Sequence, residues 1–229
     1  METQAKLNQK GITLIELLVA LIISGIAIAG IYRLFITQTT AYTVQDQVAE
    51  VQQNVRSGME ILLRDLRMTG FDDDASPAIT IANPVAFPLS DNAITLSYEY
   101  YDRNLFQYQR HTVTYNLNAL NAAILERQLT VNNVAQPLER VLENVDSLIF
   151  SYGVDQNNDG TMDDQNGDNI IDNNDWLPAA GAGTGKVIAI RVTLTTRPEQ
   201  VNPQDNRFRM VTPRTLTSAI TLRNLSKPI

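Results

Sequence analysis

The 229-residue sequence has no cysteine, one histidine and one tryptophan. The absence of cysteine excludes disulfide bonds, zinc sites with thiolate ligands and thiol catalysis. The one histidine, His111, lies in a strand-like run with no nucleophilic residue evident beside it. Because histidine is the commonest acid–base catalyst near neutral pH, a sequence with so little of it gives no support to an enzyme. We therefore expect a non-catalytic protein that is stabilised by packing or by bound ions.

Lysine and arginine are absent from residues 155–175, although seven aspartates lie there. The formal net charge of the whole chain is -7, so the remainder is roughly neutral. An acidic stretch repels phosphates, and no basic stripe with interleaved aromatic residues occurs elsewhere. We expect no nucleic-acid partner. The acidic stretch instead suggests a cation, and its aspartates are Asp155, Asp159, Asp163, Asp164, Asp168, Asp172 and Asp175.

Long hydrophobic runs are also scarce, and the mean hydropathy of -0.14 excludes a protein with several membrane spans. One run does occur, because residues 12–32 contain a single charged residue, Glu16. As a helix this run covers about the 30 Å of a bilayer core. We predict a transmembrane segment over residues 12–34. Lys6 and Lys10 place the preceding leader in the cytoplasm and the rest of the chain in the periplasm.

Residues 10–21, KGITLIELLVAL, resemble the cleavage and methylation motif of type IV prepilins. The resemblance implies that prepilin peptidase removes the leader, residues 1–11, by cutting between Gly11 and Ile12, and methylates the new amine of Ile12. A secretory signal peptide is the alternative, since Ala27-Ile28-Ala29 is similar to a small-x-small cleavage site. Against that alternative, the apolar run continues without a break, and a signal peptide has no use for Glu16.

A carboxylate within an apolar helix costs a few kcal/mol unless a partner compensates its charge. We expect Glu16 to pair with the N-terminal amine of a neighbouring pilin and so to set the register of assembly. The expected partners are therefore prepilin peptidase, other major and minor pilins, and the inner membrane, from which the subunit passes into a pilus or pseudopilus.

An apolar stripe continues beyond the membrane segment at three- and four-residue spacing and predicts that one helix spans residues 12–70. Gly70 is a natural terminator. The stripe is typical of a helix that packs on its own head, rather than of a free coiled coil. It consists of Val44, Val48, Val51, Val55, Met59, Leu62 and Leu66.

After Gly70 an aspartate- and proline-rich connector leads into a β-rich head, residues 71–229. Six runs rich in Ile, Val, Thr and Tyr predict strands at residues 93–101, 107–115, 123–130, 146–152, 186–196 and 215–223. A long helix followed by strands predicts an α+β fold with an antiparallel sheet packed on the helix, as in pilins. The glycine-rich residues 181–186 lack the spacing of a phosphate loop and precede a strand, so they predict a hairpin connection.

Three further segments resemble one branch of the family, the PilW-like minor pilins, which are related to the J-type pseudopilins of type II secretion. Residues 62–71, LLRDLRMTGF, are similar to the end of the branch's helix. Residues 145–155 are similar to the strand that leads into its aspartate-rich loop, and residues 187–192 and 220–224 to its last strands. The resemblance implies a structural subunit that takes part in initiation or assembly of the filament.

The acidic stretch contains two overlapping frames that resemble calcium loops of the EF-hand and dockerin kind. Such loops supply side-chain oxygens at positions one, three and five, a main-chain carbonyl at position seven and a water-mediated ligand at position nine. The first frame would use Asp155, Asn157, Asp159, Thr161 and Asp163, with Asn166 at position twelve. The second frame would use Asp164, Asn166, Asp168, Ile170 and Asp172, with Asp175 at position twelve.

Two alternatives remain open at this point. The acidic stretch can be a solvated, disordered turn instead of a Ca²⁺ site, since seven carboxylates repel one another. The chain can be a calcium-dependent surface adhesin, tethered by its helix or secreted, instead of a pilin. We expect Trp176 to pack beside the acidic stretch.

Overall fold

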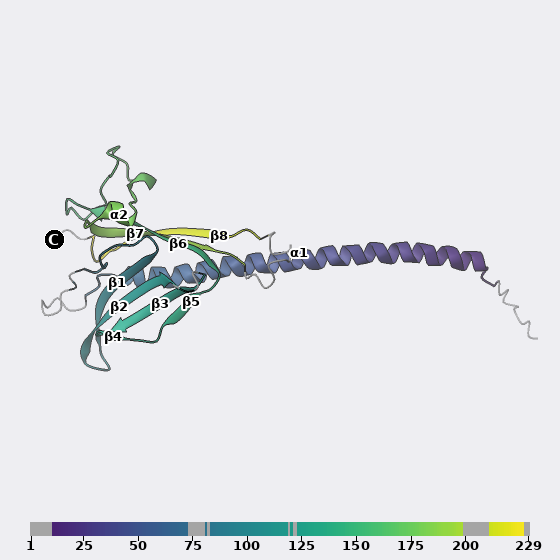
Figure 1. The fold of residues 1–229 in the computed structure, drawn as a ribbon, viewed down its shortest axis with the longest axis horizontal. Helices are drawn as coiled ribbons and strands as arrows, with labels where there is room; N and C mark the ends of the chain where they lie inside the picture. Colours follow the sequence, from purple (N-terminus) through teal and green to yellow (C-terminus); the bar gives the residue numbers. More distant parts are fainter. Residues whose placement is uncertain are drawn as a thin grey trace, which may run out of the picture. The chain divides into compact units, whose positions relative to one another are not determined.

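The structure is a computed structural model that describes residues 11–72, 81, 83–118, 120, 123–198 and 211–226. The chain forms two compact units, Met1–Asp46 and Gln47–Ile229. One helix, α1 (Leu14–Met68), contributes to both (Figure 1). Its bounds confirm the single long helix that the sequence predicts.

The first unit contains the N-terminal part of α1. Its large apolar side chains from Ile12 to Phe35, among them Ile15 and Leu21, are more than half exposed. Among the described residues, α1 is long and apolar enough to cross a membrane. Because so large an apolar surface is not stable in water, this part of the helix requires a lipid or protein environment.

The second unit contains two antiparallel sheets and the remainder of α1 (Figure 1). The first sheet has the order β1-β2-β3-β4, with β5 also paired to β3, and the second has the order β6-β7-β8. The strands are β1 (Ala93–Asp102), β2 (Gln107–Leu117), β3 (Leu125–Val131), β4 (Val134–Ala135), β5 (Glu139–Leu142), β6 (Val145–Asp155), β7 (Lys186–Thr196) and β8 (Arg214–Thr221).

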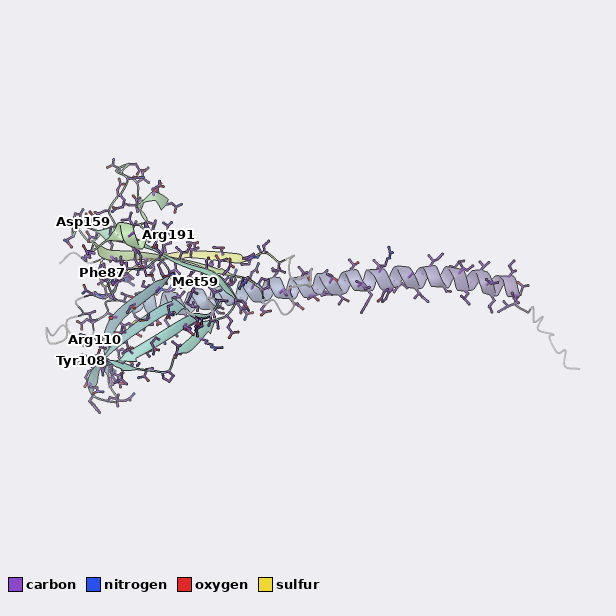
Figure 2. All side chains as sticks on the ribbon, viewed as in Figure 1. Met59, Phe87, Tyr108, Arg110, Asp159 and Arg191 are labelled. Atoms are coloured by element: carbon purple, nitrogen blue, oxygen red, sulfur yellow. The ribbon has the colours of Figure 1, made fainter. Side chains whose placement is uncertain are left out.

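The core lies where α1 meets the two sheets. Five apolar residues of the predicted stripe are at most 5% exposed, and they are Val51, Val55, Met59, Leu62 and Leu66. All but Val51 belong to one apolar cluster with Leu96 and Val113 of the first sheet and with Val192 and Leu194 of the second. Figure 2 labels Met59, in the part of the helix beside the strands. The stripe therefore packs on the head of its own chain.

Gly58 lies where α1 contacts both sheets. A Cβ at this position would lie 2.8 Å from Leu142 of β5 and 3.3 Å from Leu194 of β7. A side chain here would require the Leu142 and Leu194 side chains to shift within a close-packed interior. The glycine thus allows one helix to contact two sheets at the same level.

The helix ends as predicted. Gly70 has a φ of 71°, the left-handed conformation that glycine adopts without steric cost. Its N–H donates to the carbonyl of Ser97 in β1, and the Asn224 side chain donates to the carbonyl of Thr69. Strand and C-terminal segment thereby satisfy backbone groups at the helix terminus.

A buried polar cluster connects α1 to the first sheet. Asp65, 3% exposed, accepts hydrogen bonds from the Tyr115 hydroxyl at 2.6 Å and from Arg127 Nε at 2.8 Å. Arg127 also donates to Glu139 at 2.9 Å. Burial and the carboxylate of Asp65 raise the pKa of Tyr115. Burial alone lowers the pKa of Arg127, but Asp65 outweighs it and raises that pKa, so the guanidinium stays charged.

All six predicted strands are present within a few residues of their expected bounds. The structure divides them between two sheets, whereas the sequence pattern indicated one. The short strands β4 and β5 were not predicted, since two and four residues are too few to show alternation. Residues 181–186 do not form the predicted hairpin connection, because the segment between the paired strands β6 and β7 comprises all of residues 156–185. Residues 181–186 contain the end of a short helix, α2 (Ala179–Ala182), and the first residue of β7.

Replacing Asp65 with Ala is expected to destabilise the second unit by about 3 kcal/mol or more, because Arg127 then remains buried without its closest counter-charge. Chemical unfolding of the full chain in detergent, followed by circular dichroism, measures the change. Glu60→Ala, an exposed acidic position on the same helix, is the control and should change stability by less than about 0.5 kcal/mol. Equal effects of the two substitutions would show that the cluster contributes nothing specific.

Candidate functional site

The candidate residues lie in two places, the start of α1 and the segment between β6 and β7. The predicted cleavage site comes directly before the helix, which begins at Leu14. Gly11 and Ile12 are both exposed, and no atom lies within 4 Å of a Cβ placed on Gly11. The bond between them is therefore outside the helix and open to a protease. Lys6 and Lys10 lie outside the described residues.

Glu16 forms a capping box with Thr13 at the first turn of the helix. The Thr13 main-chain N–H and hydroxyl donate to Glu16 Oε2 at 3.0 and 2.9 Å, and the Glu16 N–H donates to Thr13 Oγ1 at 3.3 Å. The spacing Thr-x-x-Glu is the sequence signal of this cap, and our sequence analysis did not use it. Within one chain, Glu16 thus satisfies the helix N-terminus, where a negative charge is favourable.

The first acidic frame folds into a tight turn that follows β6. Asp155 is 1% exposed, and its carboxylate accepts the N–H groups of Asp159 at 3.2 Å and Gly160 at 3.0 Å. Asn157 Oδ1 accepts from Asp159 N–H, and Asp159 Oδ1 accepts from Thr161 N–H at 2.7 Å. Asp163 accepts from the N–H of Gln156. Gly160 has a φ of 84°.

The second frame repeats the same turn. The Asp164 carboxylate accepts the N–H groups of Asn166, Gly167 and Asn169. Asn166 Oδ1 accepts from Asp168 N–H at 3.0 Å, and Asp168 Oδ1 from Ile170 N–H at 2.8 Å. Asn169 has a φ of 63° and occupies the place of Gly160 in the first frame.

Asp175 closes the second frame. It is fully buried, and its two oxygens accept from Gln165 N–H and Asp172 N–H, each at 2.7 Å. A capping box with Asp172 places it in a 3₁₀ turn (Asn173–Asp175). In both frames, the residue at position one accepts the N–H of the residue at position six, and that residue has a positive φ. The two frames therefore have the same local backbone design.

The carboxylates of the loop point towards main-chain N–H groups. In the described part of the chain, which includes all of residues 155–175, no three Asp, Glu or His side chains converge as a preformed metal site. The predicted ligands are thus gathered in two turns but not arranged around a common centre, and the Ca²⁺ site stays a prediction. In the first frame, the Lys186 ammonium also lies 3.7 Å from Asp155 and partly compensates its charge.

Hydrogen bonds favour the ionised form of two loop aspartates. The hydroxyl and N–H of Thr161 lower the pKa of Asp159. The N–H of Asp172, with a further contribution from Gln165, lowers the pKa of Asp175. Such donors stabilise the carboxylate and are lost when it is protonated.

Trp176 and Arg191 attach the acidic loop to the second sheet, and Figure 2 labels Arg191 on the sheet and Asp159 in the loop above it. The Arg191 guanidinium lies 4.6 Å from the centre of the Trp176 ring and donates to Asn173 Oδ1 at 2.8 Å. Met162 packs against Gly153 of β6, where a Cβ would lie 2.6 Å from its sulfur. The loop therefore has an apolar contact with the sheet, as expected for Trp176.

His111 has a structural environment. It lies in β2, 8% exposed, with its ring 5.2 Å from that of Tyr98 and 4.9 Å from that of Tyr100. Burial, and then the charge of Arg127, lower the pKa of His111. A neutral imidazole between two aromatic rings suits packing in the sheet.

Comparison with known proteins connects these two regions. Residues 6–32 match the model described as "Prokaryotic N-terminal methylation motif", and residues 106–221, just over half of the chain, match "Type IV Pilus-assembly protein W". The chain belongs to the PilW family. No curated protein matches the chain in a sequence search. The second match extends from the hairpin of β1 and β2 to β8 and includes the acidic loop.

As a PilW-family protein, the chain is a minor pilin in type IV pilus assembly and has a structural, non-catalytic role. The methylation motif implies processing by prepilin peptidase and assembly with other pilins. The expectations of a PilW-like minor pilin, of the pilin fold and of a non-enzymatic role are thereby confirmed.

The acidic loop of this PilW-family chain is expected to loosen in acid. Because the folded-state pKa values of Asp159 and Asp175 are lowered, their stabilisation is complete above the ordinary aspartate pKa of about 3.9 and is lost as the pH falls below it. Emission from Trp176, the one tryptophan, reports the change in a titration from pH 6 to pH 2 with chelator present.

Asp175→Asn should remove part of this pH dependence, while Asp102→Asn, in the hairpin of β1 and β2 and outside the loop, should leave it unchanged. A titration curve that is the same for all three proteins would mean that the loop carboxylates do not control the loop.

Proposed function

We propose that this minor pilin is held in the inner membrane by the N-terminal part of α1, with its leader in the cytoplasm and its head in the periplasm. Its leader is cut off between Gly11 and Ile12, and the subunit then enters the pilus. The observation that supports this proposal is the methylation motif at residues 6–32, which includes the first part of α1, where the large apolar side chains are exposed. In the membrane, lipid covers that apolar surface, and in the filament the helices of other pilins cover it.

Glu16 supports an exchange of partners during assembly. Before cleavage it accepts hydrogen bonds from Thr13, and these hold its charge at the helix N-terminus. Cleavage creates a positive amine at Ile12, which a carboxylate of a neighbouring subunit can neutralise. Since a lone charge in a filament interior costs several kcal/mol, we propose that Glu16 takes this amine as its partner.

The name of the matched family favours pilus assembly over the J-type pseudopilin alternative, which no separate observation supports. A calcium-dependent adhesin is the other alternative. The acidic loop by itself suits either an adhesin or a pilin, and the methylation motif favours the pilin.

We further propose that the acidic loop binds Ca²⁺ and that the second frame is the preferred site. Ca²⁺ prefers oxygen ligands, and both frames supply them. Positions one, three and five provide aspartate and asparagine side-chain oxygens. Position seven provides the carbonyl of Thr161 or Ile170, and position nine provides Asp163 or Asp172. The second frame has a carboxylate at position twelve, Asp175, and no lysine within ion-pair distance among the described residues. The first frame has Asn166 at position twelve and Lys186 beside Asp155.

Binding requires the carboxylates to turn from main-chain N–H groups towards the ion. Each carboxylate oxygen has two acceptor sites, so a hydrogen bond to the backbone does not exclude a metal contact from the same oxygen. The repeated turn already places the oxygens of positions one, three and five on one short segment. We propose that the bound ion completes this arrangement and rigidifies the surface that the loop forms with β7 and Trp176.

Gly11→Val should leave the precursor uncut in the membrane, because a β-branched side chain next to the scissile bond hinders the peptidase. An immunoblot of cells that contain prepilin peptidase measures the mass of the product. Glu16→Val is the matched control, since it adds the same side chain within the motif; it should be cut normally but be several-fold depleted from sheared pili. Normal trimming of Gly11→Val would contradict the cleavage site, and normal incorporation of Glu16→Val would contradict the amine pairing.

Ca²⁺ should raise the melting temperature of the full chain in detergent. Binding to the folded loop alone stabilises by about 2.7 kcal/mol at a free concentration one hundred times Kd. Mg²⁺ should substitute poorly, because it requires tight octahedral geometry. Calorimetric titration and thermal melting, with Ca²⁺ or chelator, make the measurement.

Asp168→Asn and Asp159→Asn each remove one charge from position five, in the second and first frame respectively. We expect the larger loss of binding heat for Asp168→Asn, and no loss for Asp146→Asn on β6. Equal melting in Ca²⁺ and chelator, with no binding heat, would reduce the acidic stretch to a solvated turn.

A further inference from the structure

Strand β8 forms an open edge of the second sheet. Among the residues that the structure describes, it pairs with β7 alone. Figure 1 shows β8 as the outer strand beside β7. An open edge presents unpaired N–H and C=O groups that can pair with a strand of another chain.

One hydrogen bond shows which groups of β8 face outwards. The Leu222 N–H donates to the Ile188 carbonyl at 2.7 Å, directly after the last registered pair, Ala189 and Thr221. Because residues of an antiparallel pair alternate between hydrogen-bonded and non-hydrogen-bonded positions, the even-numbered residues of β8 bond to β7. The N–H and C=O groups of Thr215, Thr217, Ala219 and Thr221 therefore point away from β7, towards the open edge.

A basic pocket of about 430 Å³ lies at the end of β8, on the side where α1 packs. Its lining includes Ile220 of β8, Phe71 and the side chains of Arg67 and Arg223. Both arginines are exposed, and within the described part of the chain neither lies within 4.0 Å of a carboxylate. The pocket thus combines an apolar wall with two guanidinium groups that lack a counter-charge, which suits a carboxylate.

An apolar pocket of about 410 Å³ lies between the same end of β8 and the loop segment. Ala219 and Thr221 of β8 line it together with Met162, Ile171 and Trp176 of the loop segment. Ile171 is 53% exposed, so part of this lining remains uncovered in the single chain. A large apolar side chain fits such a lining.

The side-chain alternation of a strand connects the two pockets. Ile220 is partly buried and packs against the core on the α1 side of β8, whereas Ala219 and Thr221 are exposed on the opposite face. Ile220 and Thr221 line both pockets, and the two linings differ in the α1 residues of the basic pocket and the loop residues of the apolar pocket. A strand added to β8 would direct consecutive side chains to these same two faces. Main-chain hydrogen bonds then provide affinity, and the two pockets select the side chains.

We propose that the edge of β8 binds an extended segment of another pilus subunit, in which an acidic residue directly adjoins a large apolar residue. The carboxylate pairs with Arg67 and Arg223, and the apolar side chain contacts Met162, Ile171 and Trp176. The positive charge of Arg67 and Arg223 requires an acidic rather than a basic partner residue at the basic pocket. This interaction goes beyond the proposed Ca²⁺ binding and does not require it.

The probe is a fluorescent eight-residue peptide of alternating Thr and Val with a central Asp-Leu pair. Binding to the full chain in detergent is measured by fluorescence anisotropy, with Ca²⁺ and with chelator. Thr217→Pro removes one outward N–H without removing a bond to β7, and it should weaken binding about tenfold or more. Thr217→Val is the matched control, because it removes the hydroxyl but retains the N–H, and its Kd should not change.

Charge exchange tests the basic pocket. Replacing both Arg67 and Arg223 with Glu should weaken the Asp-Leu peptide about tenfold or more and strengthen a Lys-Leu peptide. A peptide with N-methylated backbone at alternate residues should not bind the unchanged protein, which tests edge pairing without altering the fold. The proposal is overturned if the N-methylated peptide binds as well as its parent, if the Lys-Leu peptide binds the unchanged protein equally, or if no Asp-Leu binding occurs at millimolar peptide.

Discussion

The structure depends on the burial of one face of α1, from Val51 to Leu66, against two antiparallel sheets. Neither sheet has another helix of comparable length to cover its apolar face among the described elements. The helix therefore supplies the central part of the core, and Gly58 permits its contact with Leu142 and Leu194 at once. Since the large apolar side chains from Ile12 to Phe35 are exposed, one continuous element meets two different environments.

Much of this arrangement could be predicted from local sequence patterns. The three- and four-residue spacing of the stripe predicted the buried face of α1, and Gly70 predicted where that helix ends. Runs rich in β-branched residues predicted the six longer strands. These features depend on neighbouring residues alone. The division into two sheets could not be predicted, because it depends on how strands distant in sequence pair, and each strand pattern is compatible with either sheet.

The polar contacts were less predictable than the apolar ones. The partners of Asp65, Tyr115 and Arg127, are 50 and 62 residues away in sequence. No periodicity reports such a contact. The repeated turns of the acidic loop, in contrast, follow from local spacing, because Asp, Asn and Gly at fixed offsets accept or permit specific backbone bonds.

The cap formed by Thr13 and Glu16 has a consequence for the time between synthesis and assembly. A bare carboxylate near the start of a membrane helix would favour immediate association with any available counter-charge. Here the Thr13 N–H and hydroxyl donate two hydrogen bonds to the Glu16 carboxylate, and the Glu16 N–H donates one to the Thr13 hydroxyl. A single subunit can accordingly reside in the bilayer as a monomer, so that a scarce component of the filament can accumulate there before its assembly partners are present.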